Sequence, residues 1–143
     1  MPQSLELRLN SLFPAVLSLF RVVLGLLFLV HGGAKLFAWP VDTGSGAVAF
    51  GAWPAWWAGV IEVVAGLLIA TGLFTRIAAF IASGTMAVAY FWRHQPDGLH
   101  PLQNGGETPV LFCFGFFLLV FAGGGAYALD AVLAGRRRTA VTR

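Results

Sequence analysis

Two charged side chains lie well inside long apolar segments of this chain, away from the segment ends, where an unpaired charge is costly. Glu62 lies within the apolar stretch 53–74, and Arg21 lies within the stretch 12–37. A charged side chain at membrane depth costs roughly 2.5 to 3.5 kcal/mol on insertion scales, so it usually faces a partner or a wet cavity. We therefore expect Glu62 to have a counter-charge.

Arg21 is the partner that the sequence favours for Glu62. The strings Arg21–Leu27 and Glu62–Leu68 are related, with a basic residue first in one and an acidic residue first in the other. If the two helices are antiparallel, each charge lies about eight residues in from opposite faces of a core ~30 Å thick, which leaves an axial gap on the order of 6 Å. We predict an Arg21–Glu62 ion pair near the membrane midplane.

A second polar set is predicted at the outer mouth of the helices, where it could bind a ligand. Its members are His31, Lys35, Asn104, Gly105, Gly106 and Glu107. Two adjacent glycines let the backbone bend tightly and present free N–H groups beside the Glu107 carboxylate. We predict that Lys35 and Glu107 meet there and gate the polar interior. A quinone carbonyl or a small anion would suit such a mouth. In the alternative interpretation, the buried charges serve only to fix the register of the helices.

The residue types do not favour haem, metal, disulfide, flavin or nicotinamide chemistry. His31 is the only histidine inside a predicted span, so haem lacks a pair of axial ligands. His94 and His100 match no known metal-site spacing, and no metal is predicted. The single cysteine, Cys113, excludes an internal disulfide and is interpreted as a buried, inert thiol. Flavin and nicotinamide motifs are absent, and no catalytic residue is identified.

The composition places these residues in a membrane protein. The chain has 143 residues, of which 58% are hydrophobic and 10% charged, whereas soluble domains carry about 25% charged residues. We predict one all-α domain over residues 1–143, an integral membrane four-helix bundle with helices at about 12–37, 53–73, 76–93 and 108–130. Residues 1–11 are interpreted as an interfacial lead-in to the first helix.

The distribution of basic residues predicts the orientation. With four spans both termini lie on one side, and that side holds Arg8, Arg76 and the tail arginines 136–138 and 143. The other side holds Lys35 and Arg93. The positive-inside rule therefore places both termini in the cytoplasm. Because no stacking aromatics accompany the basic tail, the charge is not interpreted as a nucleic-acid site.

Four motifs, taken in order, resemble the DoxX family of small bacterial membrane proteins. They are Arg21-x3-Gly25-x2-Phe28-Leu29-x2-Gly32-x2-Lys35-Leu36, Glu62-x3-Gly66-x5-Gly72-x2-Thr75-Arg76, Asn104-Gly105-Gly106-Glu107 and Gly123-Gly124-Gly125-Ala126-x2-Leu129-Asp130. The resemblance spans about residues 17–133. Ala128 stands where the family commonly has serine, a mild departure.

The resemblance implies a four-helix bundle in the bacterial cytoplasmic (inner) membrane, associated with respiratory or redox machinery. The family is named from a subunit of a quinol-linked oxidase system. The expected role is therefore a non-catalytic accessory or scaffold subunit, with the lipid bilayer and a redox enzyme as partners; an enzymatic member would be a quinone-linked oxidoreductase. No cofactor is identified by the motifs, and quinone is the candidate. A non-redox small-molecule carrier or membrane chaperone remains the alternative.

Overall fold

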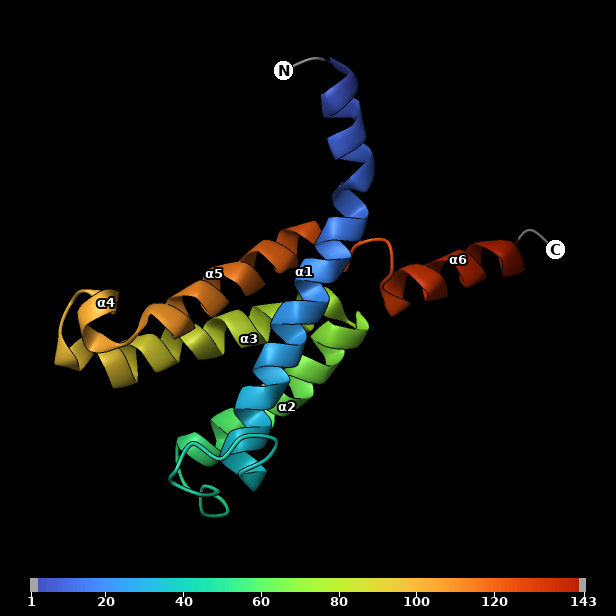
Figure 1. Ribbon diagram of the computed structural model, residues 1–143. Helices are drawn as coiled ribbons and strands as arrows, with labels where there is room; N and C mark the ends of the chain where they lie inside the picture. Colours follow the sequence, from blue (N-terminus) through green and yellow to red (C-terminus); the bar gives the residue numbers. More distant parts are fainter. Residues whose placement is uncertain (1–2, 142–143) are drawn as a thin grey trace.

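The protein is built from helices, as predicted. The computed structural model describes residues 3–141, with side chains as far as residue 135, and these residues contain no strand (Figure 1). The elements in order are α1 (Gln3–Phe37), α2 (Ala55–Thr71), α3 (Thr75–Ala89), the π-helix η1 (Tyr90–His94), the 3-10 helix η2 (Gln95–Asp97), α4 (Pro101–Asn104), α5 (Glu107–Ala122) and α6 (Leu129–Val141).

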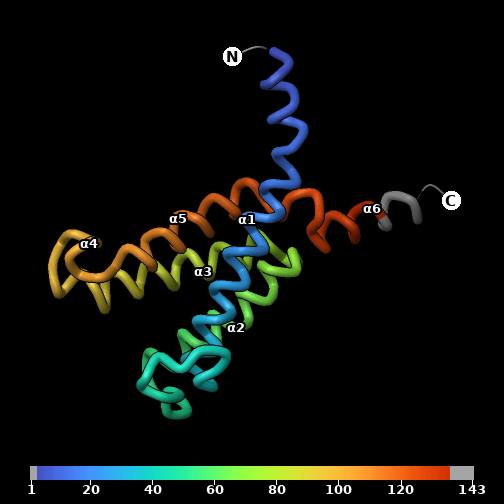
Figure 2. Tube along the Cα trace, in the orientation of Figure 1, coloured from blue at the N-terminus to red at the C-terminus, as the bar shows by residue number. Residues whose placement is uncertain are grey.

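The longer helices form two pairs. Helix α1 packs along α2, and α3 packs along α5. Figures 1 and 2 show the pairs meeting near the end of α2 and diverging away from it, while the N-terminal part of α1 and helix α6 project from the junction. The very short turn between α2 and α3 holds Gly72 in the left-handed region, with φ 76°. Glycine enters this region without steric cost, so it can end α2 abruptly.

Small residues allow α1 and α2 to approach backbone to backbone. A Cβ atom added to Gly25 would lie 2.5 Å from the nitrogen of Ala70, and one added to Gly66 would lie 2.7 Å from the nitrogen of Leu29. Further along, a Cβ on Gly32 would lie 2.8 Å from the carbonyl oxygen of Gly59. These contacts fix an antiparallel pairing of α1 and α2 in one register, as small residues commonly do in membrane helices.

An apolar core fills the region where the pairs meet. Phe28 of α1, Ile69 of α2 and Phe116 and Leu119 of α5 are almost fully buried. The rings of Phe28 and Phe116 lie 4.7 Å apart in an edge-on arrangement, a geometry that adds about 0.5 to 1.5 kcal/mol beyond the burial of area. On α3, alanines 78, 79 and 82 let α5 approach closely.

The helix boundaries differ from the predicted ones at two places. Helix α1 begins at Gln3, so residues 3–11 extend the helix instead of forming a separate lead-in, and Pro14 lies inside it. The last predicted helix, 108–130, ends at Ala122 because Gly123 takes φ 80°. After an irregular segment of three glycines, α6 begins at Leu129.

The surface outside the core is strongly apolar. Exposed residues include Leu19, Val23, Leu26 and Leu27 of α1. Among the described residues, α1 is the one helix long and apolar enough to cross a bilayer by itself, with a mean hydropathy of 2.4 over 18 residues, 28% of them buried. Helices α2 and α5 are apolar but shorter.

Candidate functional site

A cavity of about 230 Å³ lies between the two helix pairs, where they diverge. Both pairs contribute side chains to it. Its lining residues are Phe28, His31, Lys35, Glu62, Met86, Ala89, His94, Gly105, Thr108, Pro109 and Phe112. Charged and polar groups thus converge within largely apolar walls, which is the usual composition of a small-molecule site. We call it the Glu62 cavity.

The charged pair in this cavity joins Lys35 to Glu62. The Nζ of Lys35 donates to Oε1 of Glu62 over 2.5 Å, and the side chains are 36% and 2% exposed. The second carboxylate oxygen, Oε2 of Glu62, is buried and has no hydrogen-bond partner within the part of the chain that the structure describes. A buried polar atom left in this state costs about 1 to 3 kcal/mol, and more where it carries charge. Glu62, which lines the cavity, therefore holds a buried acceptor that is unused among the described residues.

The predicted Arg21–Glu62 ion pair is not formed. Arg21 is 1% exposed, and its guanidinium lies toward the C-terminal end of α2. It donates to the carbonyl oxygens of four residues: Ile69 at 2.6 Å, Ala70 at 2.5 Å, Gly124 at 2.7 Å and Tyr127 at 3.2 Å. Side chains tilt toward the N-terminus of their own helix. In an antiparallel pair, Arg21 and Glu62 consequently point away from each other.

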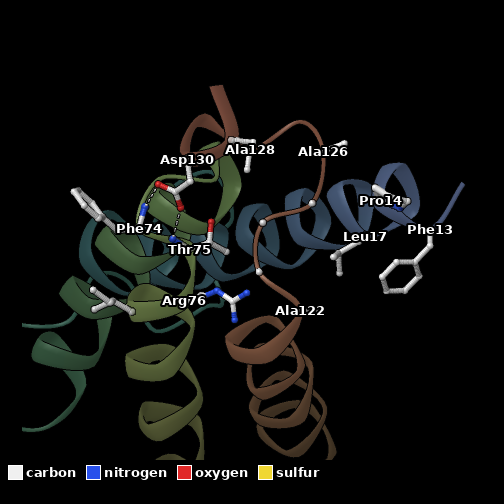
Figure 3. Close-up of a pocket in the computed structure, with 15 residues that line it drawn as sticks. Phe13, Pro14, Leu17, Phe74, Thr75, Arg76, Ala122, Ala126, Ala128 and Asp130 are labelled. Atoms are coloured by element: carbon white, nitrogen blue, oxygen red, sulfur yellow. Dashed lines mark hydrogen bonds between the residues drawn. The ribbon is translucent and has the colours of Figure 1, made fainter. Parts of the chain in front are cut away.

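The end of the molecule that holds Arg21 is organised by helix termini. The Asp130 carboxylate accepts hydrogen bonds from the backbone amides of Phe74 and Thr75, each at 3.0 Å, and so caps the start of α3 (Figure 3). Arg76 donates to the carbonyls of Val120 and Phe121 at the end of α5. Each charge complements the dipole of the helix end it contacts. Arg21 does the same for α2.

The Asn104–Gly106 turn closes the Glu62 cavity from the α5 side. Asn104 donates to the carbonyl of Gly98 at 2.7 Å, and its own side-chain oxygen accepts from the amide of Gly106 at 2.8 Å. The ring of His94 contacts the backbone oxygen of Asn104 at 3.0 Å. Gly105, with φ 69°, lines the cavity. Asn104 and Gly106 therefore shape the turn, and Gly105 reaches the site.

The remaining predicted residues are divided between the cavity and the surface. His31 lines the cavity and meets the ring of Phe112 edge-on at 5.6 Å. Glu107 lies in the first turn of α5, exposed and outside the cavity lining. The predicted meeting of Lys35 with Glu107 does not occur, because Lys35 reaches back along α1 to Glu62.

Sequence reasoning missed the contribution of α3 and η1 to the site. Met86, Ala89 and His94 line the cavity from this continuous helix. Met86 and His94 lie on opposite sides of the α3–η1 boundary, where the helix widens into a π-turn. Such turns often accompany functional sites, but no sequence pattern announces one here. His94 was visible only as a loop histidine.

The comparisons with known proteins agree with the motifs. Residues 16–95, more than half of the chain, match the DoxX family. The chain belongs to the DoxX family. A protein of Haemophilus influenzae whose function has not been characterised is 42% identical to this DoxX protein over 120 residues, covering 82% of this chain and 90% of the relative. An uncharacterised membrane protein of Mycobacterium tuberculosis is 30% identical over 138 residues, covering 86% and 83%. No solved structure is a significant match.

As a DoxX member with a membrane protein among its relatives, this chain is an integral membrane protein. Its Glu62 cavity combines one free carboxylate oxygen with the ammonium of Lys35 and the ring of His31. Within residues 3–141, no group of three His, Cys, Asp or Glu side chains converges to hold a metal ion. The arrangement can therefore bind a molecule that donates one hydrogen bond and accepts another.

Proposed function

We propose that this DoxX protein is an accessory subunit of a quinone-linked redox system and binds a quinol or quinone head group in the Glu62 cavity. The observation that carries the proposal is that Glu62 lines the cavity and that its buried Oε2 has no hydrogen-bond partner among the described residues. An acceptor of this kind is stabilised by a hydroxyl donor. A quinol has such a hydroxyl at each end of its ring.

The rest of the cavity suits the other parts of the same ligand. Lys35 uses one N–H on Glu62 and has further N–H groups for a carbonyl or hydroxyl oxygen. Phe28 and Phe112 both line the cavity, with ring centroids 5.7 Å apart at an interplanar angle of 43°, and form an aromatic wall against which a flat ring can pack. About 230 Å³ is less than the roughly 300 to 1,000 Å³ of sites for drug-sized molecules. It would hold the head group, with the isoprenoid tail passing out between the helix pairs.

We further propose four membrane spans with both termini in the cytoplasm of a bacterial cell. Helix α3 continues directly into η1, and at about 1.5 Å per residue the combined helix is roughly 30 Å long, the thickness of a bilayer core. Helices α2 and α5 are shorter, but Trp53 and Phe74 flank α2 and are apolar and exposed, as is Phe121 in the last turn of α5. The excess of arginine at the Arg76 turn and in the tail supports the orientation.

Retained quinones test the proposal directly. The protein is purified in a mild detergent, extracted with organic solvent and analysed by mass spectrometry, together with its visible absorption spectrum. We expect retained quinone, and we expect Glu62→Gln to lower the affinity for a short-chain quinol by about tenfold or more, since it replaces a charged acceptor. Glu107→Gln is the matched control, because Glu107 lies outside the cavity.

Two outcomes would contradict the proposed ligand. In one, neither variant changes quinol affinity, which places the ligand elsewhere. In the other, the cavity retains a molecule without redox chemistry and loses it in Glu62→Gln. That result would favour the carrier or chaperone alternative over the redox subunit.

A further inference from the structure

A second and larger cavity lies at the opposite end of the helices, apart from the Glu62 cavity (Figure 3). It has a volume of about 790 Å³ and is walled by α1, the start of α3, the end of α5 and the segment 123–128. We call it the Thr75 cavity. None of its lining residues is shared with the Glu62 cavity. The proposed quinol site makes no use of it.

Thr75 gives this cavity an unsatisfied polar floor. Thr75 is 1% exposed, and its Oγ1 is buried without a hydrogen-bond partner among the described residues. Gly124 lies directly against this hydroxyl, since a Cβ on Gly124 would lie 2.9 Å from Oγ1. Buried hydroxyl groups normally have a partner. The missing partner points to a ligand that reaches the floor of the cavity.

Arg76, which follows Thr75 in the chain, adds positively charged hydrogen-bond donors to the cavity. Its Nη1 is engaged by the carbonyls of Val120 and Phe121. Within the described part of the chain, Nε and Nη2 of Arg76 make no hydrogen bond, and both face Gly123, whose Cβ position lies 3.2 Å from Nη2 and 3.6 Å from Nε. A guanidinium with two adjacent free N–H groups matches the oxygens of a phosphate.

The charge around the Thr75 cavity is unbalanced toward positive. Arg21 and Arg76 lie beside it, and neither has a carboxylate within ion-pair distance among residues 3–135. Asp130 is the one acidic residue in the lining, and both of its oxygens are already bound by the amides of Phe74 and Thr75. By contrast, the Glu62 cavity holds a matched pair. An anion at the Thr75 cavity would complement the excess charge.

The outer walls of the cavity are apolar and lie on the surface of the helices. Phe13, Phe74 and Ile77 line it and are 59%, 61% and 64% exposed. In a membrane protein, such residues face the acyl chains or the head-group boundary. The cavity therefore has a cationic, hydroxyl-bearing floor and an apolar rim. Its occupant should be an amphipathic anion.

We propose that the Thr75 cavity binds one anionic phospholipid. The phosphate accepts hydrogen bonds from Nε and Nη2 of Arg76 and from the Thr75 hydroxyl, and an acyl chain lies against Leu17 and Ile77. The bound lipid ties α1 to the α3–α5 pair at the end where the glycines leave the backbone irregular.

Native mass spectrometry of the intact, detergent-purified protein tests the site. Phosphatidylglycerol and phosphatidylcholine with identical acyl chains are added in competition, and the bound fractions are compared. We expect a preference for phosphatidylglycerol of about tenfold, because its negative charge is not offset by a choline ammonium, while the phosphates of both lipids can accept the same hydrogen bonds. Arg76→Gln should reduce this preference severalfold, and Thr75→Val should lower the bound fraction of both lipids severalfold. Arg93→Gln removes the same charge from the exposed far end of the α3–η1 helix and should leave the preference unchanged.

Each other result overturns the proposal. Equal loss in Arg93→Gln would mean that only general surface charge attracts the lipid. If Arg76→Gln fails to fold, Thr75→Val decides, because it removes a hydroxyl that has no hydrogen-bond partner among the described residues; an unchanged bound fraction of phosphatidylglycerol then refutes the site. Inorganic phosphate that displaces the lipid at micromolar concentration would identify a free anion as the ligand. A dimer abolished by the same two substitutions would identify a second copy of the chain as the occupant.

Discussion

Lys35 and Glu62 form a 2.5 Å ion pair across α1 and α2, and the two side chains reach it from opposite directions. Each tilts toward the N-terminus of its own helix, as helical side chains do. Because the helices are antiparallel, this tilt brings Lys35 and Glu62 together, and it carries Arg21 toward the carbonyls of Ile69 and Ala70. The direction of the Cβ atoms thus decides which cation meets the carboxylate.

Lys35→Met should destabilise the protein more than Glu62→Gln. The first substitution leaves a carboxylate that is 2% exposed without its partner, which costs about 3 to 5 kcal/mol. The second leaves a lysine that is 36% exposed and can be hydrated. The midpoint of thermal unfolding in detergent measures both. Arg93→Gln, which breaks the exposed Arg93–Asp97 pair, should cost about 0 to 1 kcal/mol; equal losses in all three variants would contradict the assignment.

Arg21→Ala should destabilise the protein independently of Glu62. Four carbonyl oxygens lose a charged donor, each worth roughly 1.5 kcal/mol or more. Since Arg21 and Glu62 share no partner, the double variant Arg21→Ala/Glu62→Gln should equal the sum of the single variants within about 0.5 kcal/mol. An interaction energy well above that value would show that Arg21 and Glu62 interact directly.

Asp130→Ala should loosen the first turn of α3. The substitution removes the acceptor for the amides of Phe74 and Thr75, and loss of such a cap costs about 0.5 to 2 kcal/mol. Hydrogen exchange at these two amides should accelerate before global unfolding. Asp42→Ala is a suitable control, because Asp42 also accepts two amides, from Gly44 and Gly46, but in an exposed loop; it should leave α3 unaffected.

Gly25→Ala and Gly84→Ala should change the stability of the protein in opposite directions. A Cβ at Gly25 would meet the α2 backbone at 2.5 Å, whereas one at Gly84 meets no heavy atom within 4 Å. We expect Gly25→Ala to destabilise by at least about 1 to 3 kcal/mol. Gly84→Ala should stabilise α3 by roughly 0.5 to 1 kcal/mol, because alanine favours the helix. Similar unfolding midpoints for the two variants would refute the close crossing of α1 and α2.

Impermeant thiol labelling in intact cells tests the proposed orientation. In a Cys113→Ala background, cysteines at Ser45 and Leu102, both exposed, should label from outside. A cysteine at Ala134 in α6, also exposed, should label only after the cells are opened. The reverse pattern would place both termini outside, and labelling of all three in intact cells would contradict an even number of spans.

The sequence predicted the kinds of interaction better than the partners. The burial of Glu62 required a cation, and Lys35 supplies it. The predicted partner, Arg21, is wrong, because depth along the helix does not by itself determine the direction in which a side chain tilts. The role of Asp130 at α3 could not be predicted, because its two hydrogen-bond partners, Phe74 and Thr75, precede it in the chain by 56 and 55 positions. The end of α2 at Gly72 could be predicted from the local sequence, because glycine is the residue that most readily adopts the left-handed conformation at a helix end.

The close glycine contacts between α1 and α2 have a mechanical consequence. With backbone packed on backbone at Gly25, Gly66, Gly32 and Gly59, that pair cannot slide or separate without losing contact along its whole length, so it behaves as one stiff arm. If the proposed ligand enters at Glu62, we expect the other arm, α3 with α5, to move and the α1–α2 pair to stay rigid. The two arms are joined through Gly72, and α5 ends at Gly123; both glycines have positive φ, so we expect the movement to centre there, far from the carboxylate proposed to bind the ligand.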